Sequence, residues 1–114
     1  MSTYMHQSDS YKNQRQTQRV PVNLTIKMSF GTQVTLTGRI KDLSLKSAFI
    51  LVKSSVHMDM NDEISFVIEH PSDSSQQGVQ GQARISRVAA GEGIAIYFIK
   101  LDEASMNLLK QWVL

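Results

Sequence analysis

Apolar and polar residues alternate along much of the chain, and this alternation predicts a series of β-strands. The clearest run covers residues 20–28, whose apolar members are Val20, Val22, Leu24, Ile26 and Met28. Pro21 suits the first position or the edge of such a strand, because proline has no amide hydrogen to donate to a neighbour. Residues 29–32 then predict a turn.

Five further strands are expected along the chain, at 34–41, 48–52, 64–68, 79–86 and 94–98. In the first of these, Val34, Leu36 and Ile40 are expected to face inward. Gly38 shares that face, where its missing side chain permits strand coiling or a close backbone approach. The alternation slips at Arg87–Val88, which predicts a β-bulge.

The last segment of the chain predicts a helix. Asp102 is placed to cap its N-terminus, and Glu103 complements the helix dipole in the first turn. Residues at helical spacing form its apolar face: Leu101, Ala104, Leu108, Leu109 and Trp112. Six short strands and one helix predict a mostly β fold, a six-stranded antiparallel β-barrel closed by one C-terminal α-helix. Met58 and Met60 are expected to plug an end of this barrel.

Residues 1–14 are polar and show no hydrophobic period, so they predict a flexible tail ahead of a single domain at 15–114. A chain of 114 residues is long enough for one hydrophobic core and too short for two. The absence of cysteine excludes disulfides and thiolate metal sites. The N-terminus lacks the features of a signal peptide and no apolar run could cross a bilayer, so a cytoplasmic protein with no membrane partner is expected.

Charge is distributed unevenly along the chain. Residues 12–53 contain eight basic residues and one acid, a net charge of +7, although the whole chain carries only +2. This imbalance indicates an anionic partner for the first half of the chain. A solvated basic surface that keeps the protein in solution explains the same charges, and charge alone favours neither interpretation.

Two polar motifs flank the first two predicted strands. Arg15 and Arg19 precede the first strand, and Asp42 and Ser44 follow the second. Guanidinium groups bind phosphate and the acceptor edge of guanine, and a carboxylate accepts from the donor edge of that base. Each motif alone is weak, since surface arginines are common and Asp-x-Ser often forms a local turn. Antiparallel pairing of the two strands would bring the motifs side by side, so we expect half of a nucleotide site there.

Other candidate sites have weaker support in the sequence. His57 and His70 have no third metal ligand at a telling spacing, so neither a metal site nor a cofactor is expected. No histidine lies near Ser44 in the sequence to activate it as a nucleophile. Because no catalytic constellation is present, an enzyme is the least favoured class.

The two motifs resemble the paired signature of the PilZ domain family. Arg15-x-x-x-Arg19 followed by Asp42-x-Ser44-x-x-Ser47 is similar to Arg-x-x-x-Arg followed by Asp or Asn, any residue, Ser, two residues and Gly. The resemblance spans Arg15 to Val113. It implies a PilZ-like β-barrel that acts as a bacterial receptor for cyclic di-GMP.

The resemblance also implies roles for individual residues. Arg15 and Arg19 would contact the phosphates and the Hoogsteen edge of guanine, or stack on the base. Asp42 would accept hydrogen bonds from the Watson–Crick donors of guanine, and Ser44 would bond a phosphate or nearby backbone. Ser47 stands where the family pattern has glycine. Its Cβ hinders a positive φ or a close ligand approach, so we expect weaker ligand binding at this site rather than none.

A receptor that signals through an unidentified protein partner is therefore the leading hypothesis. The segment 12–19 is expected to be disordered alone and to fold over bound cyclic di-GMP. Arg84 and Arg87 could reach the ligand from a neighbouring strand, although such residues more often form a solvated surface. One alternative is a PilZ-like adaptor that does not bind the nucleotide, because of Ser47. A second is a small nucleic-acid-binding barrel, which the basic first half favours and the shortage of outward aromatic residues disfavours.

Overall fold

A computed structural model describes residues 18–31, 34–52, 58–72 and 76–114. The expected tail at 1–14, most of the segment 12–19, and the candidate residues Arg15 and His57 lie outside the described residues. None of the helical segments in the described ranges is both long and apolar enough to span a bilayer.

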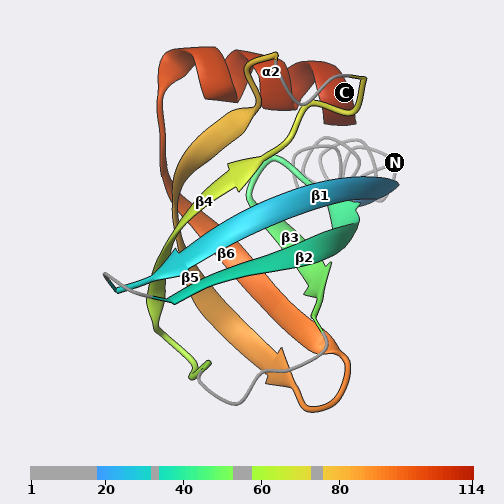
Figure 1. The fold of residues 1–114 in the computed structure, drawn as a ribbon. Helices are drawn as coiled ribbons and strands as arrows, with labels where there is room; N and C mark the ends of the chain where they lie inside the picture. Colours follow the sequence, from blue (N-terminus) through green and yellow to red (C-terminus); the bar gives the residue numbers. More distant parts are fainter. Residues whose placement is uncertain (1–17, 32–33, 53–57, 73–75) are drawn as a thin grey trace, which may run out of the picture.

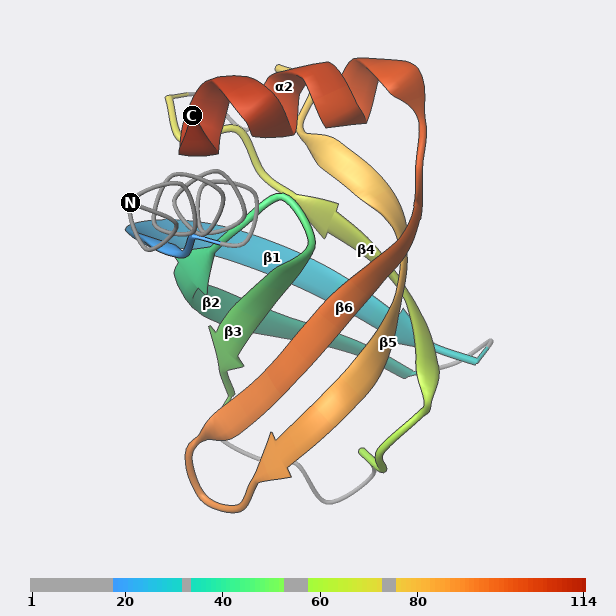
Figure 2. The same cartoon turned by 180° about the vertical axis from the view of Figure 1, so that it is seen from behind.

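Six antiparallel strands close into a barrel (Figure 1). The elements are β1 (Val20–Phe30), β2 (Val34–Leu43), β3 (Ser47–Leu51), β4 (Glu63–Ile68), β5 (Val79–Ala89), β6 (Gly93–Leu101) and α2 (Glu103–Val113). The order around the barrel is β1-β2-β3-β6-β5-β4, and β4 pairs with β1 to complete the circle. Seen from behind, β5 and β6 form a long hairpin, and α2 lies across one end of the barrel (Figure 2). The mostly β fold, a six-stranded antiparallel barrel with one C-terminal helix, is therefore confirmed.

The first hairpin is longer than side-chain alternation predicted. β1 and β2 pair as far as the last residue of β1, so the turn between them begins at Gly31, with φ +63°, rather than at Ser29. β2 runs to Leu43, so the turn after it, predicted at 42–47, contains only residues 44–46. The extra length arises because backbone groups continue to pair with the neighbouring strand after the apolar pattern has ended.

The core contains inward-facing residues from every strand and from α2. Members with no exposed surface are Ile26, Met28, Ile40, Leu43, Ala48, Ile50, Ile68, Val79, Ala83, Ile85, Ile94, Ile96 and Leu109. Gly38 faces the core as predicted, because an added Cβ would lie only 2.6 Å from Cγ2 of Ile50. Val34, expected inward, is exposed because it pairs at the end of the first hairpin, beyond the core. Met58 is buried and Met60 is exposed, so only the first of these methionines fills the barrel.

Strand β5 contains two irregularities in its pairing with β6. One lies between Ile85 and Arg87, next to the predicted bulge at Arg87–Val88, and a second, unpredicted one lies between Gln82 and Ala83. Ile85 is fully buried, whereas Arg87 is exposed. Val88 then packs against the core, so Arg87 lies on the outer wall of the barrel.

Helix α2 begins at the predicted cap. The carboxylate of Asp102 accepts a 2.7 Å hydrogen bond from the backbone N–H of Ser105, and this bond holds the pKa of Asp102 below its usual value. The apolar face differs from the prediction at one position: Ala104 is exposed and Ser105 is fully buried. A serine is tolerated there because its Oγ accepts a 3.0 Å hydrogen bond from the backbone N–H of Gln80 in β5.

Candidate functional site

The beginning of β1 and the end of β2 bring Arg19 and Asp42 together. Pro21 of β1 pairs with Asp42 of β2, which places Arg19 beside the same residue. The Arg19 Nη1 atom donates to Oδ1 of Asp42 at 3.0 Å. Their side chains are 43% and 26% exposed, so both remain accessible from solvent. The predicted juxtaposition of these two residues is therefore confirmed.

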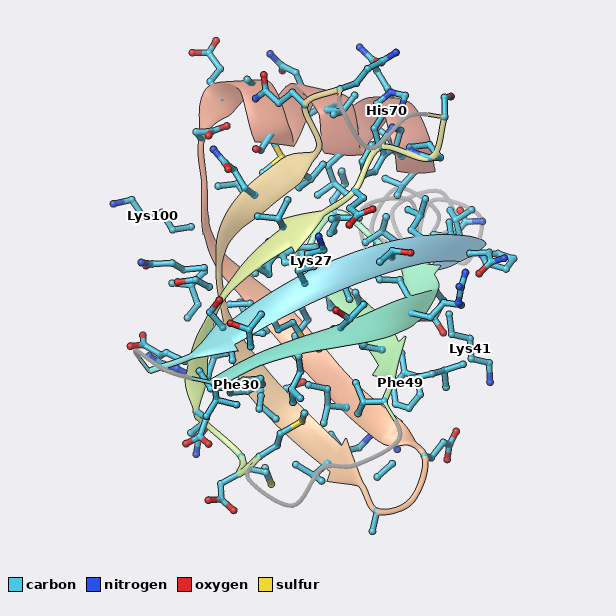
Figure 3. All side chains as sticks on the ribbon, viewed as in Figure 1. Lys27, Phe30, Lys41, Phe49, His70 and Lys100 are labelled. Atoms are coloured by element: carbon cyan, nitrogen blue, oxygen red, sulfur yellow. The ribbon has the colours of Figure 1, made fainter. Side chains whose placement is uncertain are left out.

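An irregularity in β2 turns Asp42 toward the outside of the barrel. Strict alternation would place Asp42 on the same inward face as Ile40. Instead Ile40 and Leu43 are both fully buried, and the register with β3 shifts between Ile40 and Asp42. Lys41 and Asp42 therefore both belong to the outer wall, where Figure 3 shows the Lys41 side chain extending away from the barrel. A bulge of this kind is a common way to redirect a side chain at a binding site.

Ser44 organises the turn that follows Asp42. Its Oγ accepts hydrogen bonds from the backbone N–H groups of Lys46, at 3.2 Å, and Ser47, at 3.0 Å. The backbone N–H of Ser44 donates to the carbonyl of Ser47 at 2.8 Å. Only 1% of the residue is exposed. Ser44 is thus a structural element of the turn, with its hydroxyl already satisfied by local backbone groups.

Replacing Ser44 with alanine is expected to lower the free energy of unfolding by about 1–3 kcal/mol, because two N–H groups of the turn lose their acceptor. Urea denaturation of the purified variant measures this change. Ser65→Ala is a matched control, since Ser65 is exposed on β4, and it should change stability by less than about 0.5 kcal/mol. Equal stability of the two variants would contradict the assigned role of Ser44.

Ser47 is the first residue of β3 and needs no glycine-like backbone. Among the described residues, Asn61 is the only non-glycine with a positive φ, so the φ at Ser47 is one that any residue adopts. Its Oγ lies 3.2 Å from Oγ of Ser44. Ser47 therefore adopts no positive φ in this chain, and hindrance of a close ligand approach stays a prediction.

The histidine described by the structure has structural contacts. The Nδ1 atom of His70 accepts a hydrogen bond from the backbone N–H of Ser72 at 3.1 Å. Its ring meets Trp112 of α2 edge-on, with the centroids 6.0 Å apart. In the described part of the chain, no group of three or more histidine, aspartate or glutamate side chains could hold a metal ion.

Two further outer-wall residues, one of them beside Asp42, contact each other and were not recognised as a unit from the sequence. Phe49 of β3 pairs directly with Asp42, and it is buried outside the main core. The Cζ atom of Arg87 lies over the Phe49 ring, 5.6 Å from its centroid. Because strand residues alternate between the two faces, the outward position of Phe49 between Ala48 and Ile50 could have been inferred from the sequence. All residues of the run 48–52 are apolar, so polarity did not distinguish the outward face from the inward one.

Comparisons with known proteins agree with this architecture. The family model described as the PilZ domain matches residues 13–114. The inhibitor of motility MotI/DgrA from Bacillus subtilis superposes with a TM-score of 0.70 at 9% identity, over 83% of this chain and 46% of that one. The chain thus spans about half the length of that protein.

A second similar structure is the PilZ domain of CeSA from a cellulose-synthesizing bacterium. It superposes with a TM-score of 0.63 at 19% identity, over 83% of this chain and 93% of that one. At these identities the two structures support the fold alone. No curated protein sequence matches the chain.

Proposed function

The chain belongs to the PilZ domain family, and we propose that it is a receptor for cyclic di-GMP that passes the signal to a protein partner. Domains of this family are generally cyclic di-GMP receptors that act through partners. The observation that supports the proposal most strongly is the 3.0 Å contact between Arg19 and Asp42 on the outer wall. A guanidinium and a carboxylate are the two groups that the family motifs supply, and their proximity here supports a site in which one ligand contacts both.

The proposed mechanism begins with an exchange of partners. Arg19 and Asp42 are paired with each other at a partly exposed position. Such a pair contributes only about 0–1 kcal/mol, so separating it costs little. The Asp42 carboxylate then accepts from N1–H and the 2-amino group of guanine. The released Arg19 guanidinium turns to a phosphate or to the O6 and N7 acceptors of a base.

Other motif residues have supporting roles in the proposal. Arg15, four residues before Arg19, supplies a second guanidinium, and the segment 12–19 becomes ordered over the ligand. Ser44 holds the turn so that Asp42 keeps its direction, in accord with its buried hydroxyl. The chain acts as a binding protein and not as an enzyme.

Titration calorimetry with purified protein tests the proposal. Saturable heat is expected with cyclic di-GMP and not with cyclic di-AMP, because adenine lacks the N1–H and 2-amino donors that Asp42 requires. The backbone amide NMR signals of residues 12–19 should indicate a more rigid segment when cyclic di-GMP is added. Absence of saturation at high micromolar cyclic di-GMP would exclude the receptor function.

Ser47 in place of the family glycine favours a second candidate, an adaptor that contacts its protein partner without the nucleotide. Replacing both Arg15 and Arg19 with alanine separates the two functions. An adaptor keeps its partner when both guanidinium groups are lost, whereas a receptor loses the dependence of that contact on cyclic di-GMP.

A further inference from the structure

The register of four neighbouring strands extends the Asp42 site across the outer wall. Asp42 of β2 pairs with Phe49 of β3, Phe49 pairs with Ala95 of β6, and Ala95 pairs with Arg87 of β5. We call these four positions the outer row. Adjacent strands are about 4.8 Å apart, so the path along the curved wall from the backbone of Asp42 to that of Arg87 is about 14 Å.

The side chains in the outer row bring the Arg87 guanidinium closer to Asp42 than the backbone positions of the two residues are. Ala95 is small, so no long side chain rises between Phe49 and Arg87. The Arg87 guanidinium reaches back over β6 to lie above the Phe49 ring, with Cζ 5.6 Å from the centroid. Its charged group therefore lies about one strand spacing from the strand that carries Asp42.

The environment of Arg87 leaves its donors available. The residue is exposed, and it takes part in none of the ion pairs found among the described residues. The contact with Phe49 uses the face of the guanidinium, not its N–H groups. Only 5% of Phe49 is exposed, so this ring is a fixed support. A guanidinium held in this way can bind phosphate or the O6 and N7 acceptors of guanine with little loss of side-chain entropy.

We propose that Arg87, positioned by Phe49, binds the half of cyclic di-GMP that Asp42 does not hold. The inference rests on the proposed function and extends it. Cyclic di-GMP is a ring of two ribose phosphates, each of which carries one guanine, so anchoring one guanine on Asp42 leaves an equivalent half to be bound. The outer row leads from Asp42 to the Arg87 guanidinium over a distance that one dinucleotide can bridge. Arg87 is then a third cation beside Arg15 and Arg19, and it matches the phosphate and guanine acceptors of the second half of the ligand.

The test compares Arg87→Ala with Arg84→Ala in calorimetric titrations with cyclic di-GMP. Arg84 is the matched control because it lies on the same strand but is paired at 3.0 Å with Glu63 of β4, on the side away from Phe49. Loss of a charged hydrogen-bond donor should weaken binding of Arg87→Ala by about 10- to 100-fold. Arg84→Ala should bind within about twofold of the unmodified protein.

The Phe49→Leu variant distinguishes the loss of Arg87 positioning from general damage to the fold. It keeps an apolar side chain under Arg87 but removes the ring, so we expect weaker binding in the unmodified background and no further loss in the Arg87→Ala background. Unchanged affinity of Arg87→Ala, while the unmodified protein binds cyclic di-GMP, would overturn this inference and leave the proposed function intact. If the unmodified protein does not bind cyclic di-GMP, both are overturned.

Discussion

Replacement of Asp42 by alanine is expected to weaken cyclic di-GMP binding by at least about 100-fold. In the proposed complex this carboxylate accepts two hydrogen bonds from guanine, and each bond to a charged group contributes about 1.5–3 kcal/mol. No other carboxylate lies within the outer row to replace Asp42.

The same substitution is expected to leave the barrel folded. The Asp42 side chain is on the outer wall and its ion pair with Arg19 is partly exposed to solvent, so its removal should change the free energy of unfolding by less than about 1 kcal/mol. Glu63→Ala is a matched control, because it removes another exposed carboxylate that is paired with an arginine. Calorimetric titration measures the affinity of both variants, and urea denaturation their stability. Affinity retained within a few-fold in Asp42→Ala would contradict the assigned role.

Replacement of Leu109 by alanine is expected to produce the largest loss of stability. Leu109 has no exposed surface and belongs to the core through which α2 closes the barrel end. Truncation removes apolar contacts and leaves a cavity, which costs about 2–5 kcal/mol for a buried leucine. A domain of this size is typically stable by about 5–15 kcal/mol, so much of its stability would be lost.

Urea denaturation followed by circular dichroism measures the effect on Leu109→Ala. Leu114→Ala is the control, because Leu114 is 70% exposed at the end of the same helix and should change stability by less than about 0.5 kcal/mol. Similar midpoints for the two variants would show that α2 is not needed to close the barrel.

Much of the fold could be predicted because local pattern and tertiary environment agree. The strict alternation in residues 20–28 follows directly from burial of one face of the strand. The cap at Asp102 follows directly from a local hydrogen bond. The prediction was wrong where a tertiary hydrogen bond decides the outcome, as with Ser105, whose hydroxyl is buried against the backbone of Gln80. A helical wheel cannot show that contact, so it placed Ala104 on the buried face instead.

The candidate site could likewise be predicted only in part. The proximity of Arg19 and Asp42 follows from antiparallel pairing of consecutive strands, which the sequence reveals. The meeting of Phe49 and Arg87 depends instead on β3 and β5 both flanking β6, and on a shift of register within β5. Neither the strand order around the barrel nor the position of that shift can be read from local periodicity.

The closed circle of strands restricts how a protein partner can attach. In the described part of the chain, each of the six strands has a hydrogen-bonded neighbour on both sides. This second pairing covers only part of some strands, since β2 pairs with β3 from Arg39 onward and β1 pairs with β4 only at residues 26–29. A partner that docks a strand of its own is therefore limited to these short segments of strand edge. Side chains of the outer wall and of α2 offer larger surfaces for recognition, and a partner that contacts the outer wall can detect directly whether a nucleotide covers it.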